Sequence, residues 1–269
     1  MSVPSTPRAA RRGGSLRIEG VSKSFPLKGE SLLVLDDLSL SVAPGEFVAI
    51  VGGSGCGKST LLRLLAGLDS DYEGRLLHDG APIDQPSLAR GLVFQDHRLF
   101  PWLTVEQNIG AAFTNTEVPA AERRRRVAAE IERVGLGGFA GAYPHQLSGG
   151  MQQRAAIARA LVGRAEVLLL DEALGALHAL TRLHMQKELR RLWLEEGITM
   201  VMVTHDIEEA VFLADRIVVL EARPGRVRRI QEVDLAHPRQ RRDARFVALR
   251  DGLLADFGEG GHRRASAAA

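Results

Sequence analysis

The sequence predicts an α/β fold in which a parallel sheet is interrupted by an inserted stretch of helices. Two observations lead to this fold class. Short aliphatic runs alternate with amphipathic segments before residue 95 and again after residue 166, and this alternation is typical of parallel strands that are joined by helices. Between these parts, residues 104–161 have mostly helical periodicity. No internal repeat is visible.

The first half of the sheet is predicted from runs that end in turn residues. A continuous apolar run followed by glycines is typical of a buried strand that leads into a turn. Gly67 suits the end of the helix that follows the third strand. The expected strands are 16–21, 33–42, 46–51, 74–78 and 91–95, and the expected helix is 58–66.

The inserted helices include one that is rich in arginine. Val127, Ile131 and Val134 lie at positions i, i+4 and i+7 of the segment 121–134, so one face is apolar and most of the four arginines at 123–126 point outward. The alternation then returns. The expected elements are a strand at 167–170, a helix at 180–195, a strand at 198–203, a helix at 208–214 and a strand at 216–220.

Composition limits the class of protein. The chain has 269 residues with 45% apolar and 25% charged residues, which are ordinary values for a globular protein. No stretch approaches eighteen apolar residues, and the N-terminus lacks the apolar core of a signal peptide. The single cysteine, Cys56, excludes an internal disulfide. A preference for arginine explains the basic residues, so no nucleic-acid partner is expected.

Residues 52–59 form a phosphate-binding motif. The segment GGSGCGKS lies between a predicted strand and a predicted helix, which is the context that supports this motif. Successive backbone N–H groups then face a polyphosphate at a helix start. Lys58 is expected to reach the β- and γ-phosphates, and Ser59 to bind Mg²⁺. The proposed ATP-binding set is Gly52, Gly53, Ser54, Gly55, Cys56, Gly57, Lys58, Ser59 and Thr60.

Two acids follow the most apolar strand. In VLLLDE, Asp171 and Glu172 come directly after four aliphatic residues, and buried carboxylates are costly unless a positive group lies opposite them. Asp171 is therefore predicted to face the Mg²⁺ that Ser59 holds. Glu172 is predicted to polarise the water that attacks the γ-phosphate.

A second helix start resembles a phosphate-facing site. In LSGGMQQR, Ser148 is expected to cap a helix with Gly149 and Gly150 in its first turn. Apolar positions follow at Met151, Ala155, Ala158 and Val162. Alone, this pattern indicates no more than a capped helix.

Together, these motifs resemble the nucleotide-binding subunits of ATP-binding cassette (ABC) transporters over about residues 16–220. The resemblance implies a P-loop ATPase fold with an N-terminal antiparallel β subdomain and a helical subdomain at about 96–160, all within residues 15–235. A disordered basic tail at 1–14 and a C-terminal helix with a disordered tail at 236–269 are expected to flank it.

The resemblance assigns further roles. Gln95 in VFQD corresponds to the loop glutamine that links metal and water to the helical subdomain, and His205 in VTHD to the switch histidine at the γ-phosphate. Phe25 corresponds to the aromatic residue that stacks on adenine. The implied catalytic set is Glu172, His205, Gln95 and Lys58; the implied Mg²⁺ ligands are Ser59, Gln95 and Asp171; and Ser148, Gly149, Gly150 and Gln152 are implied to contact the ATP of a second copy.

The chain departs from the family pattern at two positions. A proline usually follows the catalytic glutamate and an aspartate lies in the next loop, where this chain has Ala173 and His178. The family aspartate helps to join the two ATP sites, and imidazole lacks its fixed charge. We therefore expect ATP binding to be retained and hydrolysis to be slower or less well coupled.

The resemblance also implies partners. Transport requires membrane permease subunits and, indirectly, a periplasmic solute-binding protein, with this chain at the cytoplasmic face of the inner membrane. Residues 98–105, RLFPWLTV, form either an exposed docking patch or part of the subdomain core. Segments such as FPWLTVEQNI and LGALHALTRLHMQKEL are similar to the importer branch for sulfonates, taurine and nitrate, with aliphatic sulfonate as the first choice. The alternatives are a soluble ABC ATPase that acts on DNA or ribosomes and, more remotely, a P-loop kinase or GTPase.

Overall fold

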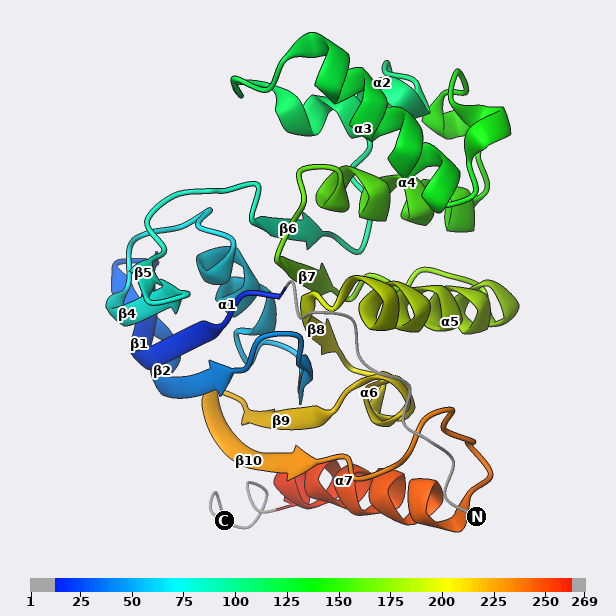
Figure 1. Ribbon diagram of the computed structural model, residues 1–269. Helices are drawn as coiled ribbons and strands as arrows, with labels where there is room; N and C mark the ends of the chain where they lie inside the picture. The colour runs from blue at the N-terminus through cyan, green and yellow to red at the C-terminus, as the bar shows by residue number, and fades with distance from the viewer. Residues whose placement is uncertain (1–12, 263–269) are drawn as a thin grey trace.

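The computed structural model describes residues 13–262 and contains two sheets and a separate group of helices (Figure 1). One sheet has four strands in the order β2-β1-β4-β5, and the other has six in the order β10-β9-β3-β8-β7-β6. The strands are β1 (Leu16–Leu27), β2 (Glu30–Val42), β3 (Phe47–Gly52), β4 (Glu73–His78), β5 (Ala81–Pro82), β6 (Arg90–Val93), β7 (Val167–Asp171), β8 (Thr199–Thr204), β9 (Arg216–Glu221) and β10 (Arg226–Glu232). The helices are α1 (Lys58–Leu65), α2 (Val105–Gly110), α3 (Ala120–Arg133), α4 (Gly149–Leu161), α5 (Ala179–Glu196), α6 (Ile207–Leu213) and α7 (Ala244–His262), with 3₁₀ turns at Ala111–Phe113, Gly137–Phe139 and Pro144–Gln146.

The six-stranded sheet is the parallel core that the sequence predicts. Strands β9, β3, β8, β7 and β6 are parallel, whereas β10 pairs antiparallel with β9 at the edge. The sequence pattern did not indicate β10, because five of its seven residues are exposed and three are arginines. Such an edge strand lacks the apolar run that marks a central one.

The core lies on both faces of this sheet. All six residues of β3 are buried, and successive side chains of a strand point to opposite faces. Phe47, Ala49 and Val51 therefore join the cluster that includes α5 and α6, while Val48 and Ile50 join the cluster that includes α1 and the antiparallel sheet. This double burial explains why the strand reads as a continuous apolar run.

The antiparallel sheet begins with a hairpin that is longer than the residue pattern indicates. Strands β1 and β2 pair from Leu16–Val42 to Leu27–Glu30, whereas the apolar runs covered only 16–21 and 33–42. The added residues near the tip are exposed, including Leu27 and Leu32, so the alternation that marks a half-buried strand is lost there.

The inserted helices α2, α3 and α4 share their own core. Val127, Ile131 and Val134 of the α3 segment are buried together with residues of α2 and α4. Of the four arginines, Arg124 and Arg125 are exposed, whereas Arg123 turns back to donate to the carbonyls of Val118 and Thr116. The helices lie in the upper part of Figure 1, beyond β6 and β7.

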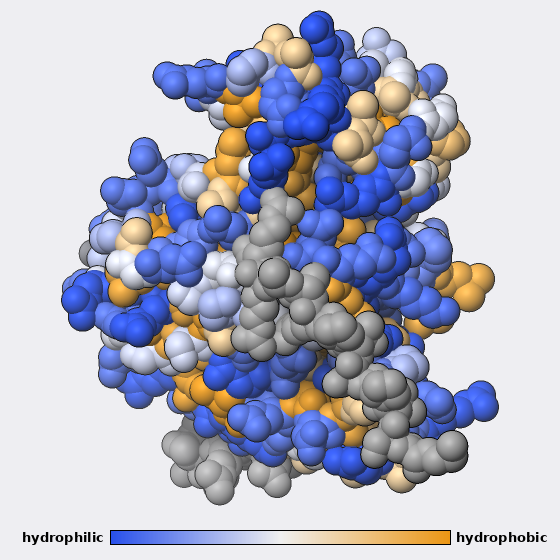
Figure 2. All heavy atoms as spheres, viewed as in Figure 1, coloured by the Kyte–Doolittle hydropathy of each residue, from blue (hydrophilic) through white to orange (hydrophobic). Residues whose placement is uncertain are grey.

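The described structure begins within the segment expected as an N-terminal tail, and it ends with a helix in the segment where a C-terminal helix was expected. Gly13 N–H donates to the Gly197 carbonyl at 3.0 Å, and α7 continues to His262. The other residues of the predicted basic tail, 1–12, and of the last segment, 263–269, lie outside the described residues. Figure 2 shows a face on which hydrophilic residues dominate and apolar residues are scattered. Within residues 13–262, no helix is long and apolar enough to span a membrane.

Candidate functional site

The glycine-rich loop turns β3 directly into α1. Gly55 and Gly57 have φ angles of 77° and 83°, a conformation that strains residues with a Cβ atom. Gly57 is the N-cap residue of α1 and makes no side-chain cap hydrogen bond. The first N–H groups of α1 therefore have no side-chain acceptor at this cap and are available to an anion.

Lys58 is folded back over this loop. Its ammonium group donates to the carbonyls of Gly52 at 2.8 Å and Gly53 at 3.0 Å, and the residue is only 7% exposed. Cys56 is fully buried in the same turn. The acceptors of this buried ammonium are neutral groups, so the oxygen of a charged phosphate is a stronger partner for it.

Ser59 and Asp171 meet across the top of the sheet. The Ser59 hydroxyl donates to Asp171 Oδ1 at 2.8 Å, although the two residues are 112 positions apart. Burial raises the pKa of Asp171, while the hydrogen bond from Ser59 acts in the opposite direction. A hydroxyl and a half-buried carboxylate at this distance are oxygen ligands of the kind that Mg²⁺ binds.

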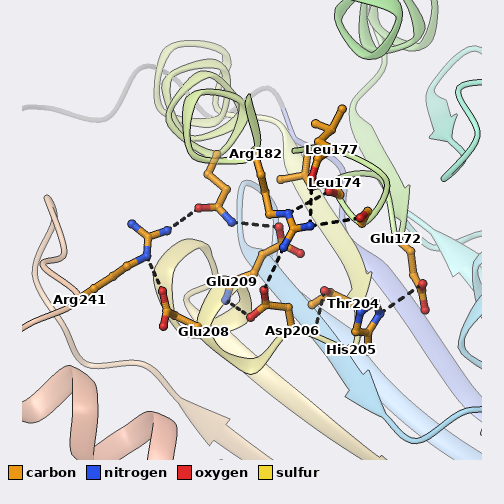
Figure 3. Close-up of polar contacts among 12 residues, drawn as sticks. Glu172, Leu174, Leu177, Arg182, Thr204, His205, Asp206, Glu208, Glu209 and Arg241 are labelled. Carbon is orange, nitrogen blue, oxygen red and sulfur yellow. Dashed lines mark hydrogen bonds and ion pairs between the residues drawn. The ribbon is translucent and has the colours of Figure 1, made fainter. Parts of the chain in front are cut away.

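Glu172 and His205 form the next pair (Figure 3). Glu172 Oε2 lies 3.3 Å from His205 Nδ1. Glu172 has a φ of 47° and its N–H donates to the Val203 carbonyl at 2.9 Å, so its backbone turns away from the line of β7 and separates its carboxylate from that of Asp171. The two acids thus face different neighbours, Ser59 and His205.

Gln95 faces the same region from the loop after β6. A Cβ atom built on Gly175 would lie 3.6 Å from Gln95 Nε2 and 3.9 Å from His205 Cε1. The two side chains therefore approach the same short stretch of backbone just after Glu172. The structure thus brings together Lys58, Ser59, Gln95, Asp171, Glu172 and His205 at the carboxyl ends of β3, β6, β7 and β8.

Phe25 lies apart from these polar groups, on the β1–β2 hairpin. It is 37% exposed, and Lys23 Nζ lies 4.8 Å from its ring centroid. Farther along the hairpin, Leu35 packs against the loop, since a Cβ atom on Gly57 would lie 2.5 Å from Leu35 Cδ2. The hairpin thus borders the phosphate loop and carries an exposed aromatic ring.

The second predicted helix start is α4. Ser148 is its N-cap, and its hydroxyl accepts a long hydrogen bond of 3.4 Å from Met151 N–H. Gly150 is buried against α5, because an added Cβ atom would lie 2.6 Å from Thr181 Cγ2. Gln152 Nε2 donates to the carbonyl of Pro144 at 2.9 Å, so this amide holds the preceding turn of its own chain.

Arg182 is a residue of the site that the sequence patterns did not indicate. Its guanidinium donates to the carbonyls of Leu174, Gly175 and Leu177 at 3.1–3.2 Å and lies 3.8 Å from Asp206 Oδ2 (Figure 3). It thus holds residues 173–178, the segment between Glu172 and α5. Its position four residues after His178, in the first turn of a helix, was the available signal.

A second missed pair joins the Gln95 loop to α4. Buried His97 hydrogen-bonds through Nδ1 to the side-chain oxygen of buried Gln153. Arg159 of α4 donates to the carbonyls of His97 at 3.0 Å and Arg98 at 2.7 Å. Gln153 belongs to the LSGGMQQR motif, so its spacing within that motif was the signal.

Residues 98–105 are partly exposed and partly buried. Val105 is buried, whereas Phe100 and Trp102 are 41% and 70% exposed with ring centroids 5.6 Å apart. Buried Asn108 fixes this segment by hydrogen bonds to the carbonyls of Phe100, Leu103 and Thr104 at 2.9–3.1 Å. The segment therefore presents two aromatic rings from a rigid backbone.

Comparisons with known proteins show the family of the chain. Residues 35–175 match the family described as ABC transporter. The aliphatic sulfonates import ATP-binding protein SsuB of Bacillus licheniformis is 50% identical over 243 residues, which cover 90% of this chain and 94% of that protein. The bicarbonate transport ATP-binding protein CmpC of Synechococcus elongatus is 48% identical over 245 residues, 88% of this chain and 37% of that protein. The dimeric structure of a bacterial ABC transporter cassette is 33% identical with a TM-score of 0.72 and covers 82% of this chain and 100% of that one.

Proposed function

The chain belongs to the ABC transporter family of ATP-binding proteins, and from this premise we propose that it is the ATP-hydrolysing subunit of an importer for small anionic solutes, with aliphatic sulfonates as the principal class. The observation that carries the proposal is the convergence of Lys58, Ser59, Asp171, Glu172 and His205 at one end of the parallel sheet. This end of an open α/β sheet is where ligands generally bind.

In the proposed mechanism, the loop N–H groups and Lys58 bind the phosphates of ATP. Lys58 exchanges the carbonyls of Gly52 and Gly53 for phosphate oxygens. Phe25 stacks on the adenine, and Thr60 lies beside Ser59 in the first turn of α1. Glu172 accepts a hydrogen bond from the attacking water and orients it toward the γ-phosphate, while His205 holds the Glu172 carboxylate and contacts that phosphate.

The donor set fits Mg²⁺. The Ser59 hydroxyl and Asp171 carboxylate lie 2.8 Å apart, and Gln95, on the loop after β6, would supply a third oxygen. When bound, Mg²⁺ would neutralise charge on the phosphates. The raised pKa of Asp171 agrees with a carboxylate whose charge is incompletely compensated when no cation is near.

We further propose that two copies pair head to tail. Each ATP would then contact the phosphate loop of one copy and Ser148, Gly149 and Gly150 of the other, while the Gln152 side chain supports this helix start. The exposed Ser148 and Gly149 leave this surface accessible, and a twofold contact is self-complementary. ATP would hold the pair together, and hydrolysis would release it.

Phe100 and Trp102 support the proposal that permease subunits dock beside the Gln95 loop. An exposed aromatic pair on a fixed backbone is typical of a binding surface. Docking there would place this chain at the cytoplasmic face of the membrane, where it would be coupled through the permease to a periplasmic solute-binding protein.

The choice of solute rests on relatives. SsuB supports sulfonates, and CmpC supports bicarbonate as a second candidate; taurine and nitrate are further members of the same chemical group. All carry a small anionic group. ATPase activity of the chain reconstituted with its permease and solute-binding protein should rise with the true solute and remain at its basal rate with the others.

The paired state is tested with Glu172→Gln. This change removes the group that orients water but keeps the phosphate contacts, so we expect ATP with Mg²⁺ to convert the monomer into a dimer on size-exclusion chromatography. Glu106→Gln, an exposed change on α2, is the matched control and should hydrolyse ATP at the normal rate. A Glu172→Gln protein that stays monomeric at saturating ATP, also with its permease, contradicts the pairing.

A further inference from the structure

A cavity of about 470 Å³ lies between the inserted helices and the sheet, away from the nucleotide site. Its walls come from α3, from the end of α4 and the loop that leads to β7, and from the residues between α5 and β8. The two parts of the molecule are joined here by the return of the chain from α4 to β7. A molecule in this cavity would contact both parts at once.

The cavity combines an apolar wall with guanidinium groups. Leu161, Val162 and Ile198 supply the apolar part, and Arg126, Arg133 and Arg164 supply positive charge. This combination fits a small ligand that has an alkyl portion and an anionic head, because the alkyl portion would contact the apolar wall and the head would pair with the guanidinium groups.

The arginines are not all neutralised by neighbours. Arg133 pairs with Glu196 at 2.9 Å and with Glu130 at 3.4 Å. Arg125 and Arg126 share one carboxylate, that of Glu122, at 2.7 Å each.

Exposed Arg164 makes no ion pair within residues 13–262 and has a φ of 64°. The four arginines Arg125, Arg126, Arg133 and Arg164 therefore have three carboxylate partners, which are Glu122, Glu130 and Glu196. One positive charge is left to pair with an anion.

We propose that this cavity binds a small alkyl-bearing anion of the alkanesulfonate class, with its head on Arg164 and Arg126 and its chain on Leu161 and Ile198; the choice of sulfonate rests on the proposed function. The occupied cavity ties α3 to the sheet. A ligand that contacts both parts stabilises their present arrangement by its differential affinity. It therefore slows any ATPase cycle in which the inserted helices move against the sheet, and the imported solute restrains its own motor.

Calorimetry on the isolated chain tests the site, with saturating ADP present so that the phosphate loop is occupied. We expect 1-pentanesulfonate to bind saturably, with sulfate and 1-pentanol each binding at least tenfold more weakly, because each lacks half of the complementary chemistry. Arg164→Gln and Arg126→Gln should each weaken pentanesulfonate about tenfold. Arg124→Gln, an exposed arginine of α3 that does not line the cavity, should leave the affinity within twofold.

The outcomes separate cleanly. No saturable binding, or equal affinity in Arg164→Gln and the unchanged protein, overturns the site. Binding without a decrease in ATPase rate overturns the restraint. Neither result bears on the proposed function, which is tested by stimulation of the ATPase through the permease. If pentanesulfonate binds but no solute stimulates the ATPase, the binding site stands and the proposed import function fails.

Discussion

The chain has two glycine-rich helix starts, and they differ in what surrounds them. At α1 the N-cap is Gly57, which offers no side-chain acceptor; Lys58 donates to the loop carbonyl of Gly52, and Ser59 donates to Asp171. At α4 the N-cap is Ser148, whose hydroxyl accepts from Met151 N–H. The start of α1 therefore has an ammonium group, a hydroxyl and a carboxylate from one chain. The start of α4 has one hydroxyl and two glycines.

Only the start of α1 is therefore a complete phosphate site. The second start is linked to it through residues 173–178, which begin after Glu172 and end beside Gly149. An added Cβ atom on Gly149 would lie 3.8 Å from Leu177 Cδ2. A substitution at one helix start can therefore affect the other through residues 173–178. Substitutions at Lys58, Ser148, Arg182 and His178 test this comparison.

Lys58→Met should have the largest effect, because it removes the one ammonium group held at the first start. Loss of charge-assisted hydrogen bonds to phosphate costs about 3 kcal/mol, or about a hundredfold in affinity. We expect ATP affinity, measured by calorimetry, to fall by that amount. Ser148→Ala is the counterpart at the second start and should leave the affinity of the monomer unchanged. Equal losses in both variants would mean that the two starts share one site within a chain.

Arg182→Met should break the link between the two starts. It removes the donor to three carbonyls of residues 173–178, so the segment that follows Glu172 is no longer held in place. We expect kcat of ATP hydrolysis to fall about tenfold, equivalent to about 1.4 kcal/mol, with unchanged ATP affinity.

Arg191→Met, on the exposed face of the same helix, should keep kcat. Arg182→Lys should restore part of it, since an ammonium group can reach some of the carbonyls. A parallel loss of affinity and kcat in Arg182→Met would instead indicate general unfolding.

His178→Asp tests the departure from the family pattern at the end of this segment. His178 is the N-cap of α5 but makes no side-chain cap hydrogen bond, and aspartate there should stabilise the helix by about 1 kcal/mol. We also expect a higher ATPase rate or cooperativity, because the fixed negative charge returns. His178→Asn supplies the cap without the charge. An unchanged rate and cooperativity in His178→Asp would remove the concern about coupling.

The sequence predicts the first start better than its surroundings, for physical reasons. Lys58, Asp171 and Glu172 lie in local patterns of buried strand and turn, and such patterns are short-range. The His97–Gln153 and Arg182–Asp206 pairs join segments that are distant in sequence, and no local period reveals such contacts. Edge strand β10 was missed because its exposed arginines hide it, and the hairpin tip because exposed leucines remove its alternation.

An effect on stability alone should come from a histidine that touches neither helix start. His237 packs edge-on against Trp193, and burial, together with Arg239 and Arg190, lowers its pKa from 6.5 to about 3. The folded protein therefore keeps it neutral, while the unfolded chain gains a proton below pH 6.5. Stability is then full above that pH and falls between pH 6.5 and 3, by about 1–2 kcal/mol at pH 5 after allowance for its partial exposure.

Urea unfolding at pH 7.5 and pH 5 measures this loss in the free energy of unfolding. His237→Phe keeps a ring against Trp193 but cannot take up a proton, so it should lose less stability on acidification. Burial also lowers the pKa of His78 and of His97, so part of the acid sensitivity will remain. ATP affinity at pH 7.5 should be equal in both proteins, because neither helix start contacts this ring. An identical loss of stability in His237→Phe would assign the acid sensitivity to the other two histidines.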